Sequence, residues 1–252
     1  MVHVITVHHG AAAWIPIQLA YLKRNIAEPF HVHTCCTGGL RSTAELESMG
    51  TVYPWDATPK GGCSYDHAMK LDYMANQVCA DGNADDLVMF IDSDTLVLPG
   101  VMDTAREYLD RFQLVAARRS ERNCRLAHPL FCVTTARVWR ELPGTWTPGP
   151  YRTPDSRIID DTGSRLLQRM DGAKTAWHAF TRSNKVELTK TGHFGIYGDI
   201  VYHHQAGSRP TTGTRANQPA KRIEPQVFKL LQTHVDFYKL FIEGKYLDQI
   251  NQ

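Results

Sequence analysis

The segment Leu87–Ile91 constrains the fold of this chain more than any other, because five consecutive apolar residues lead directly into two carboxylates, Asp92 and Asp94. A short apolar run bounded by acidic and turn-forming residues is typical of a strand buried on both faces in a parallel sheet. Ligands of such sheets bind beyond the carboxyl ends of the strands. The sequence therefore predicts an α/β protein with a candidate site at this end of the strand.

Strand and helix patterns alternate through the first part of the chain. We expect strands at residues 2–7, 30–36, 51–53 and 87–91, a helix at 14–26, a short helix from an N-cap at Ser42 to Met49, and a helix at 65–79 whose apolar face is formed by Tyr65, Met69, Tyr73 and Met74. This alternation indicates βαβ units with right-handed crossovers. It predicts a Rossmann-like, mostly parallel sheet flanked by helices.

The second half of the chain has a less regular pattern. We expect strands at 114–117, 130–134 and 200–202, an irregular proline-rich loop at 142–155, a helix that opens at Asp161, a mobile loop at 205–224 rich in Gly, Pro and Thr, and an amphipathic helix at 227–243. The pattern shows no internal repeat, and 252 residues are enough to bury a substantial core. We therefore expect a single domain.

Composition narrows the class of protein. The 28 Lys and Arg residues nearly balance the 26 Asp and Glu residues, which gives no electrostatic footprint of a dedicated nucleic-acid binder. The sequence contains no signal-peptide pattern and no apolar run of the ~18 residues that span a bilayer. We expect a soluble, cytoplasmic protein.

The six cysteines lack the spacing of zinc fingers and the C-x-x-C pair of redox motifs. Several lie in apolar surroundings, so free and mostly buried thiols in a reducing compartment are expected instead of disulfides. The cysteines are Cys35, Cys36, Cys63, Cys79, Cys124 and Cys132.

Asp92 and Asp94 form the one D-x-D pattern in the chain. Side chains at positions i and i+2 of an extended segment leave the same face, so both carboxylates can bind one hard divalent cation such as Mg²⁺ or Mn²⁺. The alternative is a solvated turn that caps the following helix. The strand that precedes the pair favours the metal site.

The order of these motifs resembles the GT-A fold of nucleotide-sugar glycosyltransferases, particularly enzymes similar to glycosyltransferase family 2. The matching segments are Phe90-Ile91-Asp92-Ser93-Asp94, Asp160-Asp161-Thr162-Gly163-Ser164-Arg165-Leu166, Asp171-Gly172-Ala173-Lys174-Thr175-Ala176-Trp177, and a late histidine at His203 or His204. The resemblance spans roughly residues 1 to 210 and rests on the ordered set of motifs.

The resemblance implies a metal-dependent enzyme that moves a hexose from a nucleotide sugar, such as a UDP- or GDP-hexose, to a hydroxyl acceptor. Asp94 would bind Mn²⁺ or Mg²⁺, Asp92 would reach the ribose or the waters of the metal, and either His203 or His204 would complete the site. We expect transfer with inversion, which needs a carboxylate base. Asp161 is the candidate for this base, with Asp160 as the next candidate and a helix N-cap as the alternative role.

Further residues are candidates for donor and acceptor contacts. Basic side chains can bind diphosphate oxygens, although each one alone can also be a solvated surface charge. Trp146 and Tyr151 offer apolar faces for an acceptor or else pack onto the domain. The candidates for donor binding are Ser93, Arg165, Arg209 and Lys60, and the histidines that could line the cleft are His8, His9, His67 and His128.

The resemblance also suggests how the domain is organised. Within a single domain over 1–252, the nucleotide-binding half would cover 1–100 and the acceptor half 101–204. The mobile loop at 205–224 and the C-terminal helix within 225–252 would follow. Residues 205–224 carry several basic side chains, so the loop is a candidate lid over the donor.

The chain departs from the family pattern at two places. Cys35-Cys36-Thr37 stands where the family often has an acidic residue that grips the base, so the donor base stays open. The acidic pair is Asp-Asp instead of Glu-Asp, so which carboxylate faces the acceptor also stays open. A glycan, a lipid-linked sugar, a protein hydroxyl and a modified nucleobase are all possible acceptors.

Two other classes of protein are alternatives. Haloacid-dehalogenase-like phosphatases also carry D-x-D after a buried strand, but with Thr or Val where this chain has Leu96, and near the start of the chain. The other alternative is a module that binds a nucleotide sugar without catalysis. Hydrolysis of a nucleotide sugar, of a phosphomonoester, or of neither would separate the three classes.

Overall fold

The computed structural model describes residues 1–10, 12–55, 63–119, 125–153, 156–183 and 195–204, together with residues 229 and 231. The loop expected at 205–224 and most of the helix expected at 227–243 lie outside these residues, as do Lys60 and Arg209. Within the described residues, no helix combines the length and the hydropathy that a membrane span requires.

The chain alternates strands and helices in its first half, as the sequence predicts. The first-half elements are β1 (Val2–His9), α1 (Trp14–Asn25), β2 (Phe30–Thr37), α2 (Ala44–Met49), β3 (Gly50–Val52), α3 (Cys63–Asp81), β4 (Leu87–Ile91), β5 (Thr95–Val97) and α4 (Val101–Leu109). The later elements are β6 (Leu114–Ala117), β7 (His128–Thr135), α5 (Ala136–Glu141), β8 (Tyr151–Arg152), β9 (Ile158–Ile159), α6 (Ser164–Gly172), β10 (Trp177–Phe180), β11 (Gly195–Tyr197) and β12 (Val201–His203).

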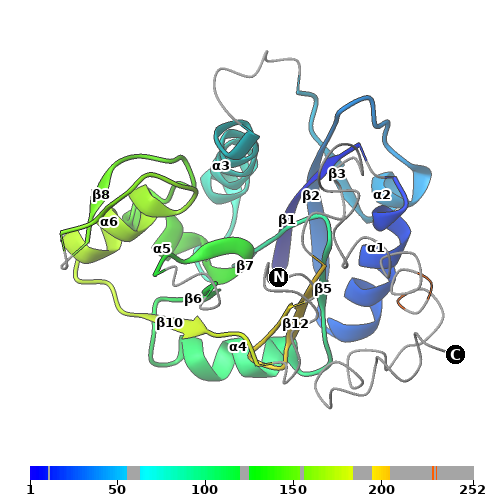
Figure 1. Ribbon diagram of the computed structural model, residues 1–252. Coiled ribbons are helices and arrows are strands. Elements are labelled where there is room, and N and C mark those ends of the chain that lie inside the picture. Colours follow the sequence, from blue (N-terminus) through cyan, green and yellow to red (C-terminus); the bar gives the residue numbers. More distant parts are fainter. Residues whose placement is uncertain are drawn as a thin grey trace, which may run out of the picture.

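Seven strands form the central sheet, in the order β10-β6-β7-β4-β1-β2-β3 (Figure 1). Every ladder of this sheet is parallel except those of β7, which runs antiparallel to both β4 and β6. The predicted mostly parallel sheet flanked by helices is therefore confirmed. The exception, β7, lies beside the strand that carries the D-x-D motif.

Helices cover both faces of the sheet (Figure 1). Residues of α1, α2 and α4 pack with one side of the strands, and residues of α3, α5 and α6 pack with the other. Along β1, Val2 and Val4 belong to the first core, whereas Ile5 and Val7 belong to the second. This division follows from the alternation of side chains along a strand.

The strand β4 lies between β1 and β7 and is buried on both faces, since none of its five residues is more than 3% exposed. Full burial of one large aliphatic side chain contributes about 1.5–3 kcal/mol, so an apolar strand in this place is strongly favoured. Asp92 and Asp94 follow at its carboxyl end, as predicted.

A second, three-stranded sheet has the order β11-β12-β5 and is antiparallel. It pairs β5, which directly follows the D-x-D motif, with β12, which ends at His203.

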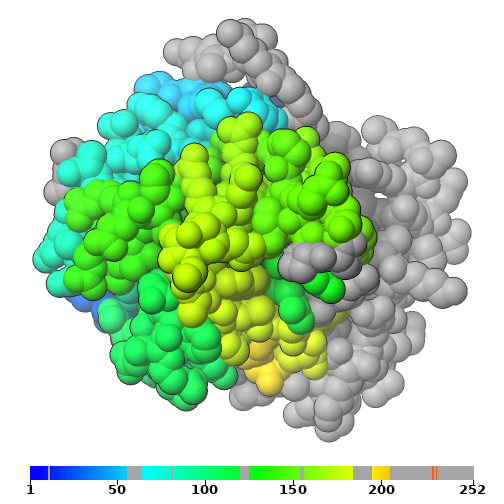
Figure 2. Space-filling model, turned by 90° about the vertical axis from the view of Figure 1, so that its left-hand side faces the viewer, coloured from blue at the N-terminus to red at the C-terminus, as the bar shows by residue number. Residues whose placement is uncertain are grey.

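Figure 2 shows a different face of the molecule, on which the yellow-green residues around α6 and β10 lie in the middle.

The predicted apolar face of α3 is wrong for three of its four residues. Tyr65, Met69 and Tyr73 are 36%, 38% and 39% exposed, and of the predicted set only Met74 is buried. A different face packs on the sheet, and its buried residues are Ala68, Leu71, Met74, Ala75 and Val78.

Two predicted helix starts are shifted. Thr43, and not Ser42, is the N-cap of α2, and its side chain accepts a hydrogen bond from the backbone of Leu46. Gly163 occupies the N-cap position of α6, so the helix starts at Ser164 and not at Asp161.

Residues 142–150 lack regular structure, as expected for the proline-rich loop, but β8 occupies its later part.

The prediction of free thiols is confirmed for the cysteines whose side chains are described. Cys35, Cys36, Cys79 and Cys132 are free, and all but Cys36 are buried. Burial raises the pKa of the Cys79 thiol to about 11, although the neighbouring Arg140 opposes this shift. A buried thiol with a raised pKa is mostly protonated near neutral pH and therefore a weak nucleophile.

Gly163→Ala should destabilise the protein by at least about 2 kcal/mol. Gly163 has a left-handed φ of 89°, and a Cβ at this position would lie 2.4 Å from the carbonyl oxygen of Ala127. Gly172→Ala in the same helix is the matched control, because space around Gly172 is open. The control should be neutral or stabilising by up to about 1 kcal/mol. Equal free energies of unfolding for the two variants in urea would contradict this account.

Candidate metal and active site

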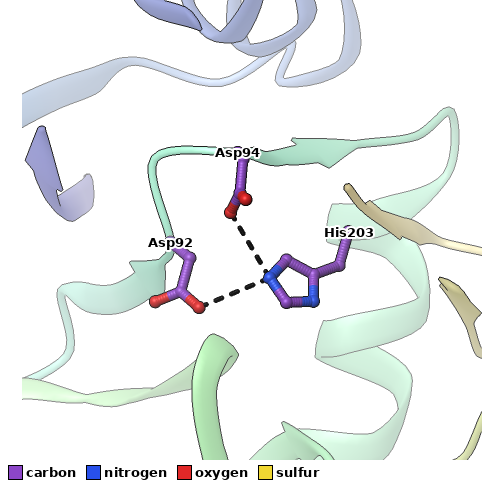
Figure 3. A group of neighbouring side chains, drawn as sticks. All are labelled: Asp92, Asp94 and His203. Carbon is purple, nitrogen blue, oxygen red and sulfur yellow. Dashed lines mark ion pairs between the residues drawn. The ribbon is translucent and has the colours of Figure 1, made fainter. Parts of the chain in front are cut away.

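The structure brings Asp92, Asp94 and His203 together at the carboxyl end of β4. His203 Nε2 lies 3.5 Å from Asp92 Oδ2 and 3.3 Å from Asp94 Oδ1 (Figure 3). The side chains of Asp94 and His203 are each 6% exposed, whereas that of Asp92 is 19% exposed. Within the part of the chain that the structure describes, no other group places three potential metal-binding side chains within 4.8 Å of one another.

Gln18 of α1 holds the turn that carries the two carboxylates. Its buried amide nitrogen donates hydrogen bonds to the backbone carbonyls of Asp92 at 2.8 Å and of Thr95 at 3.0 Å. The backbone N–H of Thr95 also donates to the carbonyl of Asp92 at 3.0 Å. The carboxylates are therefore presented by a turn that is fixed from its buried side.

The pairing of β5 with β12 positions His203. In this ladder His203 lies opposite Thr95 and Tyr202 lies opposite Leu96. The next residue, His204, donates its backbone N–H to the carbonyl of Asp94 at 3.0 Å. Since side chains alternate along a strand, only one of the two adjacent histidines can face the carboxylates.

His203 is the histidine that faces the carboxylates, which decides between the two sequence candidates. His204 is 1% exposed and lies elsewhere. Its Nδ1 is 2.8 Å from the hydroxyl of Tyr202, and its ring packs against Trp14 with 4.6 Å between ring centroids. His204 therefore supports the wall of the site and does not face its interior.

The residues present fit a divalent cation. Two carboxylates and one imidazole nitrogen form a mixed oxygen and nitrogen ligand set. The set as a whole suits Mn²⁺, and its two carboxylates also suit Mg²⁺, which prefers oxygen ligands. In addition, Asp92 Oδ1 is buried and lacks a hydrogen-bond partner among the described residues. Two carboxylates close together, of which Asp94 is buried and Asp92 partly buried, are costly without a compensating positive charge.

His67 of α3 is a further histidine at this site. Its Nε2 lies 3.6 Å from Asp92 Oδ1, and its side chain is 29% exposed. The sequence predicts His67 only as one of four histidines that could line the cleft. The signal that could have selected it is its place near the start of a helix that follows a strand, because such helix starts lie at the carboxyl edge of a parallel sheet.

Ser93 and His8 are buried near the ends of their strands. Ser93 is 7% exposed and His8 is 1% exposed. Burial lowers the pKa of His8 to about 4, so its ring is neutral at physiological pH. Neither of its ring nitrogens has a hydrogen-bond partner among the described residues. His8 lies opposite Cys36 in the parallel ladder of β1 and β2 and is not part of the Asp92, Asp94 and His203 group.

The acidic pair Asp160 and Asp161 is exposed and lies in the turn before α6. Asp161 Oδ1 accepts the backbone N–H of Thr162 at 2.7 Å, so Asp161 stabilises this turn and does not cap the helix. This turn packs against Ala127, the residue before β7, because Gly163 lies close to the carbonyl of Ala127.

The start of β7 in turn contacts the D-x-D turn. The carbonyl of Leu130 accepts the backbone N–H of Asp92 at 3.4 Å. Ala127 and Leu130 lie at the same end of β7. The turn with Asp161, which packs against Ala127, therefore lies at the same edge of the sheet as Asp92. Arg165 is also exposed, and its side chain lies over Gly149 of the proline-rich loop.

The two loop aromatics proposed as acceptor surfaces pack into the protein instead. Trp146 is fully buried and contacts Phe90 with 5.2 Å between ring centroids. Tyr151 is 7% exposed, and its hydroxyl donates a hydrogen bond to Asp171. Asp72 of α3 orders this loop, because it accepts hydrogen bonds from the backbone of Trp146 at 2.7 Å and from the hydroxyl of Thr147 at 2.8 Å.

Comparison with known proteins finds similarity in fold to solved glycosyltransferases. S. aureus TarS in complex with UDP is 14% identical, with a TM-score of 0.42 over 57% of this chain and 49% of that chain. The galactosyltransferase LgtC, in complex with donor and acceptor sugar analogs, is 12% identical, with a TM-score of 0.49 over 92% of this chain and 95% of that chain. The mannosyltransferase PcManGT from Pyrobaculum calidifontis, in complex with GDP-Man and Mn²⁺, is 12% identical, with a TM-score of 0.47 over 97% and 73%.

The chain spans about half of the length of the TarS chain. No family model and no curated protein matches the sequence. The likeness is remote, so a function for this chain has to be argued from its own residues.

The stability of the protein should fall with pH because of His8. The folded chain keeps His8 neutral down to about pH 4, whereas the unfolded chain protonates it below the ordinary value of 6.5. Between these values the unfolded state binds more protons, so the free energy of unfolding decreases as the pH falls. His8 should contribute about 2 kcal/mol of this loss at roughly pH 5.

His8→Phe removes the titrating group and keeps an aromatic ring, so its melting temperature should depend less on pH than that of the wild type. The comparison requires melting curves at about pH 7.5 and at roughly pH 5. Burial also lowers the pKa of His33 to about 3, so part of the dependence should persist in the variant. Parallel curves for the two proteins would contradict the assignment to His8.

Proposed function

We propose that the protein is a metal-dependent glycosyltransferase that moves a hexose from a nucleotide sugar to a hydroxyl acceptor, with inversion. The observation that carries the proposal is the Asp92, Asp94 and His203 group at the carboxyl end of the central strand. This edge of a mostly parallel sheet is where ligands bind. The resemblance of the motif order to GT-A enzymes and the fold of the solved neighbours agree with it.

In this proposal Asp94 and His203 hold Mn²⁺ or Mg²⁺, and Asp92 contacts the cation, its waters or the donor ribose. A bound cation would neutralise the negative charge that develops on the departing diphosphate. The near-complete burial of Asp94 and His203 fits this role, because it fixes both side chains before the ligand arrives. The imidazole of His203 must be neutral at Nε2 to donate an electron pair.

Asp161 is the proposed base that takes the proton of the acceptor hydroxyl. An inverting transfer needs a carboxylate on the side of the sugar opposite the leaving group. Asp161 is exposed, so an acceptor can reach it, and its turn rests on the residues that precede β7. Asp160, which is also exposed, is the next candidate.

Ser93, His8 and Arg165 are proposed donor contacts, with Arg209 as a further candidate outside the described residues. Neutral His8 can accept or donate a hydrogen bond, and its ring nitrogens have no partner within the described part of the chain. UDP and GDP sugars are the donors to test first, because the solved neighbours include complexes with UDP and with GDP-Man. Hydrolysis of a phosphomonoester but not of a nucleotide sugar would favour a phosphatase instead.

Asp94→Asn should abolish nucleotide binding that depends on Mn²⁺, because it removes a charged ligand from a hard-cation site. Titration calorimetry with UDP and with GDP, in Mn²⁺ and in chelator, measures the effect. We expect at least about a tenfold loss of affinity in Mn²⁺ with the fold intact. Asp103→Asn, on the exposed side of α4, is the matched control. Nucleotide affinity that is equal in the wild type and in Asp94→Asn would exclude the proposed metal site.

Asp161→Asn should lower turnover by about a hundredfold or more and leave donor affinity nearly unchanged, because the amide cannot accept the proton of the acceptor. The amide oxygen can still accept the Thr162 N–H, so the melting temperature should change little. Asp160→Asn changes the neighbouring carboxylate and should retain most activity. Transfer rates for the two variants decide between them, and full activity of Asp161→Asn would remove this residue from the mechanism.

A further inference from the structure

The carboxylate of Asp92 lies between two histidines that come from different elements. Its Oδ2 faces His203 of β12 at 3.5 Å, and its Oδ1 faces His67 of α3 at 3.6 Å. Figure 3 shows that the second oxygen of Asp92 points away from His203. Each oxygen of this carboxylate therefore has its own imidazole neighbour.

His67 is held in place by the packing of α3. The residues Ala68 and Leu71 are fully buried against the sheet, in the same core as Ile5 and Phe90. On the other side of His67, Asp66 forms an ion pair with Lys70 within one turn of the helix. The backbone of His67 therefore belongs to a helix that is packed on the sheet beside this residue, with an ion pair that spans it.

His67 and His203 differ in their position relative to the two carboxylates. The three grouped side chains place one ligand atom each within 4.8 Å of one another, and His67 is not a member of this group. Asp92 is the most exposed of the three, and its Oδ1 lacks a hydrogen-bond partner among the described residues. A carboxylate held at only one oxygen can rotate about its terminal bond.

We propose that His67 is a positioning residue of the metal site, which holds Asp92 Oδ1 so that Oδ2 faces the point shared by Asp94 and His203. This inference rests on the metal site of the proposed function. The Nε2–H of His67 is the donor, and the separation of 3.6 Å shortens to a hydrogen bond when the site binds its cation. Hydrogen bonds to ligating carboxylates orient them and tune metal affinity.

Titration of the protein with Mn²⁺ alone tests the inference without a nucleotide, a donor or an acceptor. His67→Ala should weaken Mn²⁺ binding by about tenfold to a hundredfold. His67→Gln should retain affinity within about threefold of the wild type, because its amide N–H can occupy the place of Nε2–H. Gln77→Ala, at an exposed position of the same helix, should bind Mn²⁺ like the wild type. Melting temperatures check that each variant is folded.

Pulsed electron paramagnetic resonance of bound Mn²⁺ separates a positioning residue from a ligand. The nitrogen coupling of a directly bound imidazole should persist in His67→Gln and in His67→Ala at saturating Mn²⁺, and should disappear in His203→Ala. Wild-type Mn²⁺ affinity in His67→Ala, or equal losses in the Ala and Gln variants, would overturn the positioning role. Loss of the nitrogen coupling in His67→Ala would also overturn it, since His67 would then be a ligand.

The outcome for His67 is distinguishable from the outcome for the proposed function. If the wild type binds Mn²⁺ and Asp94→Asn does not, the metal site stands, and the His67 variants then decide the positioning role alone. If the wild type binds no Mn²⁺, the metal site and the role of His67 are both wrong. Sugar transfer in the absence of any His67 effect would leave the proposed function intact and remove only this inference.

Discussion

The pairing of β5 with β12 is the interaction on which the candidate site depends. It carries His203 to the two carboxylates that follow β4, although the histidine is far from them in the sequence. The ladder is stabilised by burial of its apolar side chains, since Leu96, Val97, Val201 and Tyr202 are at most 1% exposed. Because the same ladder fixes which side of β12 faces inward, it also determines that His203 and not His204 completes the group.

The rest of the fold holds this arrangement rigid. The strand β4 is buried from both sides by helices, and Gln18 fixes the turn after it through two backbone carbonyls. Close carboxylates repel each other and lose solvation when buried, so a site of this kind is stable only with compensating positive charge. The imidazole of His203 lies between both carboxylates, and a bound cation would supply the remaining compensation. The scaffold therefore holds two neighbouring carboxylates in a fixed arrangement, as the proposed metal site requires.

The sequence predicts the parts of this account that depend on local pattern. The buried strand with Asp92 and Asp94 and the alternation of strands and helices follow from apolar runs and turns. The face of α3 did not follow, because apolar side chains at helical spacing lie on two of its faces, and the one with Tyr65 and Met69 is exposed in the folded chain. The choice of His203 required the register of a ladder between distant segments. His67 was predicted only as one of four histidines that could line the cleft, because its partner Asp92 is likewise distant in the sequence.

The proposed function depends on one divalent cation bound by Asp92, Asp94 and His203. Anomalous X-ray scattering at the manganese edge, from crystals grown with Mn²⁺, locates such an ion without any assumption about substrate. The account predicts one strong anomalous peak in contact with Asp94 Oδ1 and His203 Nε2. Its absence, or a peak bound only by other residues at full Mn²⁺ occupancy, would contradict the account.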